Sequence, residues 1–283
     1  MTDEFIAGWI DTLLDGRGAP PAMARVLEVL RTAPQEAAFA TVKAMAAAAH
    51  VNIATVTRTA QFLGFTGWPA FIIEYRGHYL AGLRADSMLA PAGEVGASGP
   101  REVVLGDIST LQGMAEGLDE DAYSRAAARI RSARRTVVLA TGTYLAPAEV
   151  LAHNGQLLGY DLELPHGPSS AQLNAVRKLG EGDVVIAFTV WKTAEIVLRL
   201  ARFARERGAA LVVFADRSTE AARLAEVVVT VPSESSRYLP STIPAVAAVQ
   251  AVLTVLADLD REHVEAHLRE ADELWRSMGI VEP

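Results

Sequence analysis

The chain has 283 residues and a formal net charge of −8, with 51% hydrophobic and 21% charged residues. This composition, with Gly and Pro at ordinary frequency, excludes a disordered, collagen-like or low-complexity protein, and the length suits one large or two ordinary domains. Cys is absent, which excludes disulfides, thiolate metal sites and a cysteine nucleophile.

The first eighty residues predict a helical bundle. Apolar residues at helical spacing indicate a helix over residues 5–14 and another near 23–30, with Gly and Pro between them. Further helices are expected at about 41–48, 53–63 and 68–80, and no strand pattern occurs here. Residues 41–80 hold three basic residues and one acid within an otherwise acidic chain. This imbalance is a weak indication of a polyanionic partner.

Residues 90–100, APAGEVGASGP, have the composition of a linker. We therefore expect one domain over residues 1–80, a linker and connecting helix over 81–117, and a second domain over 118–283. Helices are expected near residues 103–114 and 119–131.

Short β-branched runs then alternate with helical stretches. Strands are expected at residues 136–140, 161–164, 183–189, 210–215 and 227–231. Strands that are apolar on both faces and spaced by helices predict a parallel sheet covered on both sides. In such sheets, ligands bind at the carboxyl ends of the strands.

Two long helices, at about 241–259 and 261–278, are expected to close the chain. The apolar run Ile243–Ala257 has 15 residues, fewer than the roughly 20 that span a bilayer. We interpret it as a buried helix. Because the N-terminus is acidic and unlike a secretory signal, a soluble cytoplasmic protein is expected.

Residues 41–68 predict a helix-turn-helix, with two short helices meeting at residues 50–52. Asn52 is a suitable N-cap for the second helix, whose inward residues would be Val56, Ala60 and Leu63. A polar outer face with few acids is what a DNA-reading helix needs. The candidate DNA-contact residues are Lys43, Asn52, Thr55, Thr57, Arg58 and Gln61.

This segment resembles the DNA-binding domain of the RpiR family of bacterial transcriptional regulators. The matching residues are Ala46, Val51, Thr55, Val56, Arg58, Leu63, Gly64, Phe65 and Gly67. Asn52 replaces the family's usual Ser, and His50 replaces its usual Gly in a left-handed turn, where His is somewhat strained. Residues 41–63 alone also fit a helical bundle that does not bind DNA, but the LGF-x-G continuation favours DNA binding.

The same family joins this domain to a SIS (sugar isomerase) domain, a five-stranded parallel sheet between helices. Residues 118–283 look like one, and the matching segments are 136–140 with Gly142, 183–189, 204–216 and 224–232. The resemblance implies a transcription factor controlled by a small metabolite, typically a phosphorylated sugar or amino sugar.

The two loops that hold the ligand in SIS domains depart from the family pattern. The first usually resembles G-x-G-x-S, of which only Gly142 is kept, and Tyr144 replaces the Ser. The second usually resembles S-x-S-G-x-T, of which only the first hydroxyl survives as Thr189, and Ala194 replaces the closing Thr.

Two interpretations of this site remain open. In one, Lys192 binds phosphate as a point charge, assisted by Thr143, Thr189 and Thr193. In the other, the ligand is less phosphorylated or more apolar, and Trp191 and Tyr144 form an aromatic wall. A solvated surface lysine and ordinary aromatic packing are the alternatives to both.

A third loop, residues 232–242, is rich in hydroxyls, and Ser241 and Thr242 are expected to contact the ligand. The other polar residues of this loop are Ser233, Ser235, Ser236 and Arg237.

An aldose–ketose isomerase is the rival function, because SIS domains also occur in such enzymes, and a non-catalytic sugar-binding protein is a third possibility. The candidate bases Glu234, His166 and His153 lie in no catalytic motif, and each is expected to be a solvated side chain. No dinucleotide fingerprint, P-loop or metal-ligand spacing is present. We therefore expect no enzymatic activity, no cofactor and no metal.

A regulator of this kind is expected to be a homodimer or a dimer of dimers. The apolar helix 243–257 is the candidate interface. Two recognition helices would then meet half-sites about 34–36 Å apart, so a palindromic operator is expected.

Overall fold

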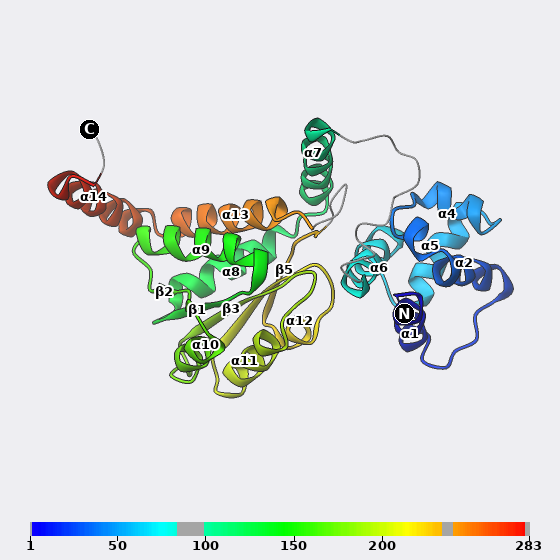
Figure 1. Ribbon diagram of the computed structural model, residues 1–283, viewed down its shortest axis with the longest axis horizontal. Helices are drawn as coiled ribbons and strands as arrows, with labels where there is room; N and C mark the ends of the chain where they lie inside the picture. The colour runs from blue at the N-terminus through cyan, green and yellow to red at the C-terminus, as the bar shows by residue number, and fades with distance from the viewer. Residues whose placement is uncertain (1, 84–98, 234–239, 281–283) are drawn as a thin grey trace. The chain divides into compact units, whose positions relative to one another are not determined.

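The computed structural model describes residues 2–83, 99–233 and 240–280. The chain divides into two compact units, and the division falls within α7 (Pro100–Glu116), between Val103 and Val104 (Figure 1). Residues 90–98 of the predicted linker 90–100 lie outside the described residues.

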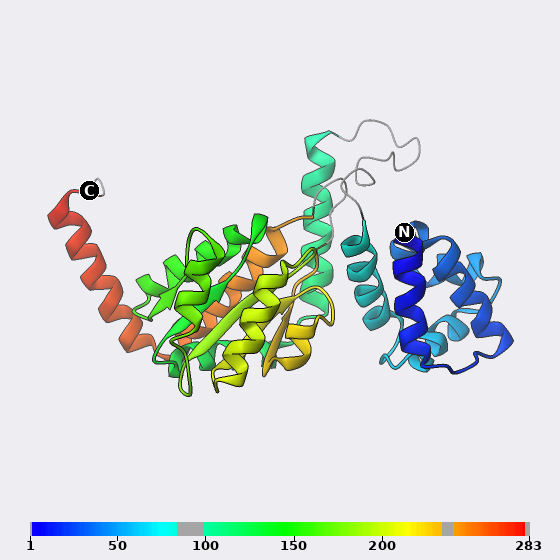
Figure 2. The same cartoon turned by 60° about the horizontal axis from the view of Figure 1, so that its bottom comes forward.

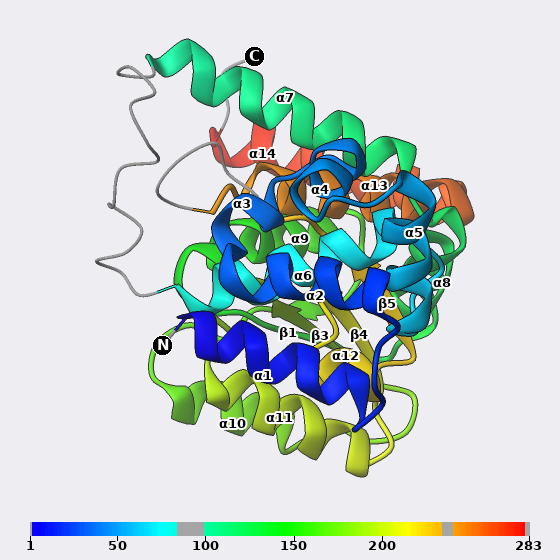
Figure 3. The same cartoon turned by 90° about the vertical axis from the view of Figure 1, so that its right-hand side faces the viewer.

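The first unit is a helical bundle, as predicted (Figure 3). Its helices are α1 (Thr2–Leu14), α2 (Pro21–Thr32), α3 (Pro34–Ala38), α4 (Val42–Ala48), α5 (Ile53–Phe62) and α6 (Trp68–Gly82). The short α3, which begins at Pro34, was not predicted, since five residues are too few to show a helical period.

The core of this unit forms where α1, α2 and α6 meet. Ile6, Ile10 and Phe71 are fully buried there. The Tyr75 hydroxyl donates a 2.6 Å hydrogen bond to the carbonyl of Leu30, which satisfies a buried polar group and links α6 to α2. This core supports α4 and α5, which carry the candidate DNA contacts.

The second unit is built on a five-stranded parallel sheet of order β2-β1-β3-β4-β5, which confirms the expected fold class. The strands are β1 (Thr136–Leu139), β2 (Leu162–Glu163), β3 (Val184–Thr189), β4 (Ala210–Ala215) and β5 (Val227–Thr230). All six residues of β3 are buried, because strands lie on both sides of it and helices cover both faces.

Helices cover the two faces of the sheet in two separate layers (Figures 1 and 2). One layer consists of α8 (Glu120–Ser132), α9 (Leu145–Leu157) and α13 (Ile243–Leu259). The opposite layer consists of α10 (Ser169–Val176), α11 (Glu195–Glu206) and α12 (Glu220–Leu224). The side chains of β1 alternate accordingly, since Val138 packs with the first layer and Val137 with the second.

One apolar face of α13 packs inside this unit. Ala248, Val252 and Leu256 are fully buried against α8 and α9, which confirms the predicted buried helix. The outer positions Gln250 and Thr254 are polar and exposed. Ile243 and Leu259, at the two ends of the helix, are exposed apolar residues, and the dimer interface expected on this helix stays a prediction.

The final helix, α14 (Arg261–Met278), follows a 107° bend after α13. Within the described ranges, no single helix is long and apolar enough to span a membrane, although α13 and α14 taken together as a bent pair pass that test of length and composition.

Candidate DNA-contact helix and candidate ligand site

The turn between α4 and α5 is closed by two backbone hydrogen bonds. The N–H of His50 donates to the carbonyl of Ala47 (3.1 Å), and that of Val51 donates to Ala46 (2.9 Å). This pairing places His50 in the left-handed region, with φ of +50°, as the sequence predicted. His50 is exposed, so only its backbone conformation is required by the turn.

Asn52 caps α5, as predicted. Its side-chain Oδ1 accepts hydrogen bonds from the backbone N–H of Thr55 (2.8 Å) and from the Thr55 hydroxyl (2.9 Å). Thr41 caps α4 in the same way, accepting from the N–H of Ala44 at 3.1 Å. Both helices of the motif therefore begin at side-chain caps that satisfy free amides of the first turn.

The faces of α5 agree with the sequence prediction except at Thr55. Val56, Ala60 and Leu63 are buried. Thr55 was predicted on or beside the outer face, but it is 5% exposed, and its hydroxyl donates to the Asn52 side chain. The remaining candidates lie outside: Lys43, Asn52, Arg58 and Gln61 are exposed and Thr57 is half-buried.

A second left-handed turn ends α5. Gly64 has φ of +97°, its N–H donates to Gln61 (3.0 Å), and the N–H of Phe65 donates to Ala60 (3.1 Å). The Phe65 ring then packs beside the core. The LGF element therefore has a structural reason: the turn needs a glycine, and the residue after it anchors the exit of the helix.

In the second unit, the loop after β1 carries three of the predicted ligand residues. Gly142 (φ +60°) and Thr143 are exposed, at the start of a 3₁₀ turn, η2 (Gly142–Tyr144). Tyr144 is only 4% exposed and packs in the core beneath α9, so its ring is not an open aromatic wall. Its hydroxyl has no partner among the described residues. Burial, reinforced by the negative charge of Asp216, raises the pKa of Tyr144.

The predicted ligand residues in and before the loop after β3 differ in how exposed they are. Thr189 has no exposed surface, and its hydroxyl lies 3.1 Å from that of Thr219. The hydroxyl is therefore hydrogen-bonded within the unit and is not accessible to a ligand. Lys192 is exposed, with Nζ 5.6 Å from the centre of the half-buried Trp191 ring. The Thr193 hydroxyl oxygen is buried and, within the described part of the chain, makes no hydrogen bond.

A buried carboxylate that the sequence analysis did not select holds this loop. Asp216, at the end of β4, is 2% exposed and accepts hydrogen bonds from the Trp191 N–H (2.8 Å) and the Ser233 hydroxyl (2.7 Å). Arg217 pairs with it (2.8 Å) and donates to the Trp191 carbonyl (2.6 Å). Burial raises the pKa of Asp216, while Arg217 and the two donors oppose that shift.

Gln172 on α10 was also not selected. It is 6% exposed, and its Nε2 donates to the carbonyl of Ala140, at the end of β1, at 3.2 Å. That bond fixes the orientation of the amide, because a carbonyl accepts only from the NH₂ group. The opposite atom, Oε1, is buried without a described partner. The signal for Gln172 in the sequence is that it is a single polar residue on an otherwise apolar helix face.

The third loop is described only in part. Ser241 accepts a hydrogen bond from the N–H of Ile243 (3.2 Å), so it stabilises the start of α13, and Thr242 is half-buried beside it. Ser235, Ser236, Arg237 and the candidate base Glu234 lie outside the described residues. The other candidate bases are exposed: His166 lies 3.3 Å from Glu149, and His153 faces solvent.

Comparison with known proteins finds relatives of both units. Residues 15–80 match the model of the helix-turn-helix domain of the rpiR family. The HTH-type transcriptional regulator HexR of Escherichia coli K12 is 24% identical over 221 residues, which cover 76% of this chain and 75% of HexR.

Two solved structures share the fold. The Vibrio vulnificus NanR protein, complexed with ManNAc-6P, has a TM-score of 0.61 and 15% identity, with 96% of this chain and 98% of NanR covered. The sugar isomerase domain of an RpiR transcription factor from Sphaerobacter thermophilus has a TM-score of 0.59 and 25% identity, with 62% and 98% covered. The chain is thus similar to transcriptional regulators of the RpiR type, with a helix-turn-helix unit followed by a unit that has the SIS fold.

Proposed function

We propose that the chain is an RpiR-type transcriptional regulator that senses a carbohydrate derivative at the carboxyl edge of its parallel sheet. The observation that supports this proposal is a set of buried polar atoms with no described partner: Tyr144 Oη, Gln172 Oε1 and Thr193 Oγ1. Buried polar groups in proteins are nearly always hydrogen-bonded. These three belong to segments next to the ends of β1 and β3, where ligands of such sheets bind.

The chemistry of these atoms favours a polyhydroxylated ligand. Two are hydroxyls, which both donate and accept hydrogen bonds. The third, Gln172 Oε1, only accepts, so its partner is a ligand hydroxyl or N–H and not a phosphate oxygen. A sugar offers donors and acceptors of this kind around one ring.

The phosphorylated form is favoured by Lys192. It is an exposed cation in the same loop as Thr193, and Tyr144 lies in the core instead of forming an apolar wall. NanR, which shares this fold, was solved with the phosphosugar ManNAc-6P. We propose Gly142, Thr143, Tyr144, Gln172, Lys192 and Thr193 as ligand contacts, with Trp191, Ser241 and Thr242 beside them.

We further propose that the SIS-type unit regulates and does not catalyse. Sugar isomerisation needs a base held against the substrate. His166 is an exposed partner of Glu149, and His153 is solvated. Incubation of the chain with aldose and ketose phosphates in D₂O should give no interconversion or deuterium incorporation above the blank by NMR. Turnover that disappears in His166→Ala would contradict this proposal.

In the DNA-binding unit, we propose direct DNA contacts by Lys43, Asn52, Thr57, Arg58 and Gln61, with Thr55 holding Asn52 in place. A homodimer would present two copies of α5 to a palindromic operator in the cytoplasm. We propose residues 1–80 as the DNA-binding domain, 81–117 as the connection and 118–283 as the sensor. Light scattering that finds only monomer at micromolar concentration would contradict the dimer.

The ligand is tested by thermal shift on the full chain. The panel contains aldose, ketose and amino-sugar phosphates, their unphosphorylated forms and inorganic phosphate. A ligand at 100 times its Kd adds about 2.7 kcal/mol of stability. We expect a phosphosugar to raise the melting temperature more than its neutral form does. Lys192→Ala should remove this difference between the two shifts, whereas the exposed control Lys178→Ala should keep it. A panel without any carbohydrate response would overturn the proposal.

The DNA contacts are tested with Arg58→Ala. This side chain is exposed, and its one hydrogen bond among the described residues goes to the Thr55 hydroxyl (3.3 Å), so folding should be unchanged. Binding to a duplex that the wild-type chain enriches from a random library should weaken. Arg177→Ala, exposed in the second unit, is the control. Wild-type affinity in Arg58→Ala would remove Arg58 from the set of contacts.

A further inference from the structure

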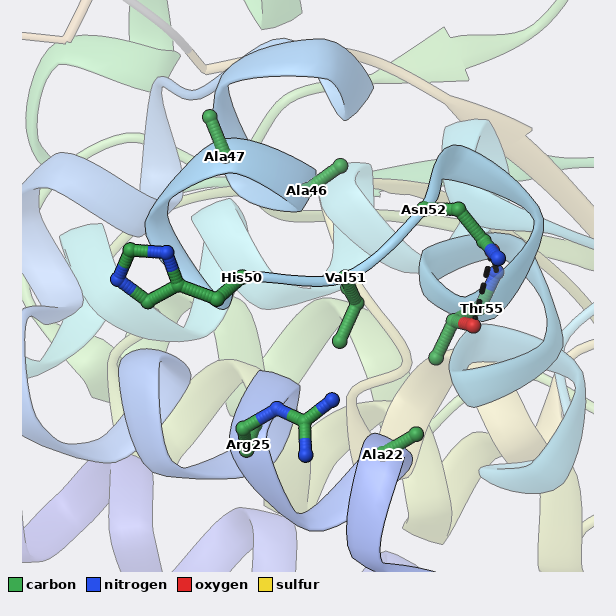
Figure 4. A pocket seen from close by; sticks show the side chains of 8 residues that line it. All are labelled: Ala22, Arg25, Ala46, Ala47, His50, Val51, Asn52 and Thr55. Atoms are coloured by element: carbon green, nitrogen blue, oxygen red, sulfur yellow. Dashed lines mark hydrogen bonds between the residues drawn. The ribbon is translucent and has the colours of Figure 1, made fainter.

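The first unit contains a cleft beside the recognition helix that the predicted DNA contacts do not explain. Its volume is about 650 Å³, and it lies between α2, the end of α4 and the start of α5 (Figure 4). The residues that line it are Ala22, Arg25, Ala46, Ala47, His50, Val51, Asn52 and Thr55.

Arg25 gives this cleft its charge. Its Nε donates a 3.3 Å hydrogen bond to the carbonyl of Ala49, the C-cap residue that follows α4, and this bond anchors the guanidinium. Its two terminal Nη groups have no hydrogen-bond or ion-pair partner among the described residues. No Asp or Glu lines the cleft. Figure 4 shows the guanidinium on the α2 side, facing the segment from His50 to Asn52.

The opposite wall supplies further donors. Asn52 Oδ1 already accepts two hydrogen bonds from Thr55, so its NH₂ group remains to donate outward. Arg58 is drawn toward the same end of α5 by its bond to the Thr55 hydroxyl (3.3 Å). An anchored guanidinium and an amide donor thus line a cleft without acids, and Thr55, which also lines it, accepts the hydrogen bond from Arg58.

We propose that this cleft binds a backbone phosphate of the DNA, so that Arg25 of α2 clamps the duplex beside the helix that enters the groove. The inference rests on the DNA-binding function of this unit. A guanidinium donates two parallel hydrogen bonds to a phosphate, which gives orientation as well as charge. Arg25 belongs to neither helix of the helix-turn-helix, so its contact positions the protein on the DNA without reading sequence.

The test compares Arg25→Gln with the wild-type full chain. Fluorescence anisotropy measures Kd against salt for the duplex enriched by the wild-type chain and for an unrelated random duplex. We expect binding to both duplexes to weaken about tenfold at low salt, because a hydrogen bond to a charged group contributes about 1.5–3 kcal/mol. The slope of log K against log salt should become shallower by about 0.9, the value for one phosphate.

Two variants control for folding and for charge. Arg31→Gln removes a cation of the same helix that pairs with Asp11, and it should leave affinity and slope unchanged. Arg25→Lys keeps the charge without the planar fork, so the salt slope should return while affinity recovers only in part. Melting temperatures of all three should stay close to that of the wild type, apart from the small loss of the Ala49 contact.

Three outcomes would overturn the proposal. Arg25→Gln that keeps wild-type affinity and salt slope excludes a phosphate at the cleft. A loss confined to the enriched duplex assigns Arg25 to base reading instead. A wild-type chain that enriches no duplex contradicts the DNA-binding function itself and is thereby distinguishable from failure of the clamp alone.

Discussion

The backbone N–H of Trp191 points at the buried carboxylate of Asp216 and donates a 2.8 Å hydrogen bond to it. This bond coincides with a φ of +56° at Trp191, a conformation that bulky residues rarely adopt. The contact joins the loop after β3 to the loop after β4. The hydrogen bond from the Ser233 hydroxyl to Asp216 joins the segment after β5 to them. The strained residue is held by the carboxylate, and its neighbours Lys192 and Thr193 are positioned by the same contact.

We expect Arg217→Ala to weaken this junction strongly. Arg217 is 12% exposed in its side chain, and its removal leaves the Asp216 carboxylate buried without a cation. Breaking a buried ion pair from one side costs about 3–5 kcal/mol. Chemical denaturation of the full chain should show this loss, whereas Arg199→Ala, an exposed helix pair with Glu195, should change stability by less than about 0.5 kcal/mol. A loss below about 1 kcal/mol would mean that the carboxylate is neutral or well solvated.

Thr193→Val tests the proposed ligand contact without changing side-chain shape. Its buried hydroxyl has no described partner, so the variant should be as stable as the wild type or slightly more stable. The thermal shift caused by the carbohydrate derivative should fall, because one ligand hydrogen bond is lost. Thr254→Val, on the exposed side of α13, is the control and should keep the full shift. An undiminished shift in Thr193→Val would remove this residue from the site.

His50→Gly should stabilise the DNA-binding unit. A left-handed residue after a helix costs a non-glycine side chain about 1–2 kcal/mol, partly offset by the greater flexibility of unfolded glycine. We expect a net gain of about 0.5–1 kcal/mol in the free energy of unfolding. Ala48→Gly, two residues earlier and helical, should instead lose about 1 kcal/mol. Equal losses in both variants would show that the His50 side chain stabilises the turn.

Gly159→Ala should disturb the packing of α14 against the end of α9. Gly159 has φ of +90°, and an added Cβ would lie 2.4 Å from Cγ of His267 and 2.7 Å from Nε2 of His263. We expect a loss of more than about 2 kcal/mol from strain and overpacking together. Gly167→Ala has a similar φ of +93° with no atom within 4 Å, so it isolates the backbone strain. Equal losses in the two variants would contradict close packing at α14.

Alkaline pH should destabilise the second unit through Tyr123. Burial raises the pKa of Tyr123 from 10.0 to about 12, and the residue is 4% exposed. Burial favours the neutral phenol in the folded state. The contribution of this phenol to the free energy of unfolding is therefore complete below pH 10 and is lost as the pH rises through 12. The loss is on the order of 2–3 kcal/mol, since each pKa unit corresponds to about 1.36 kcal/mol. Tyr123→Phe should lose less stability between pH 9 and 12 in denaturant titrations, and parallel curves would contradict the assignment.

The sequence by itself determined the features that depend on near neighbours. The Asn52 cap, the inward row of Val56, Ala60 and Leu63, and the five strand segments were predicted from residue type and spacing, and the left-handed His50 from the resemblance to the RpiR family. A cap bonds to an amide three residues away, and a helical face repeats within one or two turns, so residue type and spacing suffice.

Only the tertiary structure decided which side chains share a site. Thr189 has the right chemistry for a ligand contact, yet its hydroxyl is used by Thr219, thirty residues further on. Asp216 and Gln172 act on residues 25 and 32 positions away, and Arg25 faces a turn that lies 24 residues later at Ala49. Such contacts are made by strand order and helix packing, which bring distant segments together and leave no local pattern in the chain.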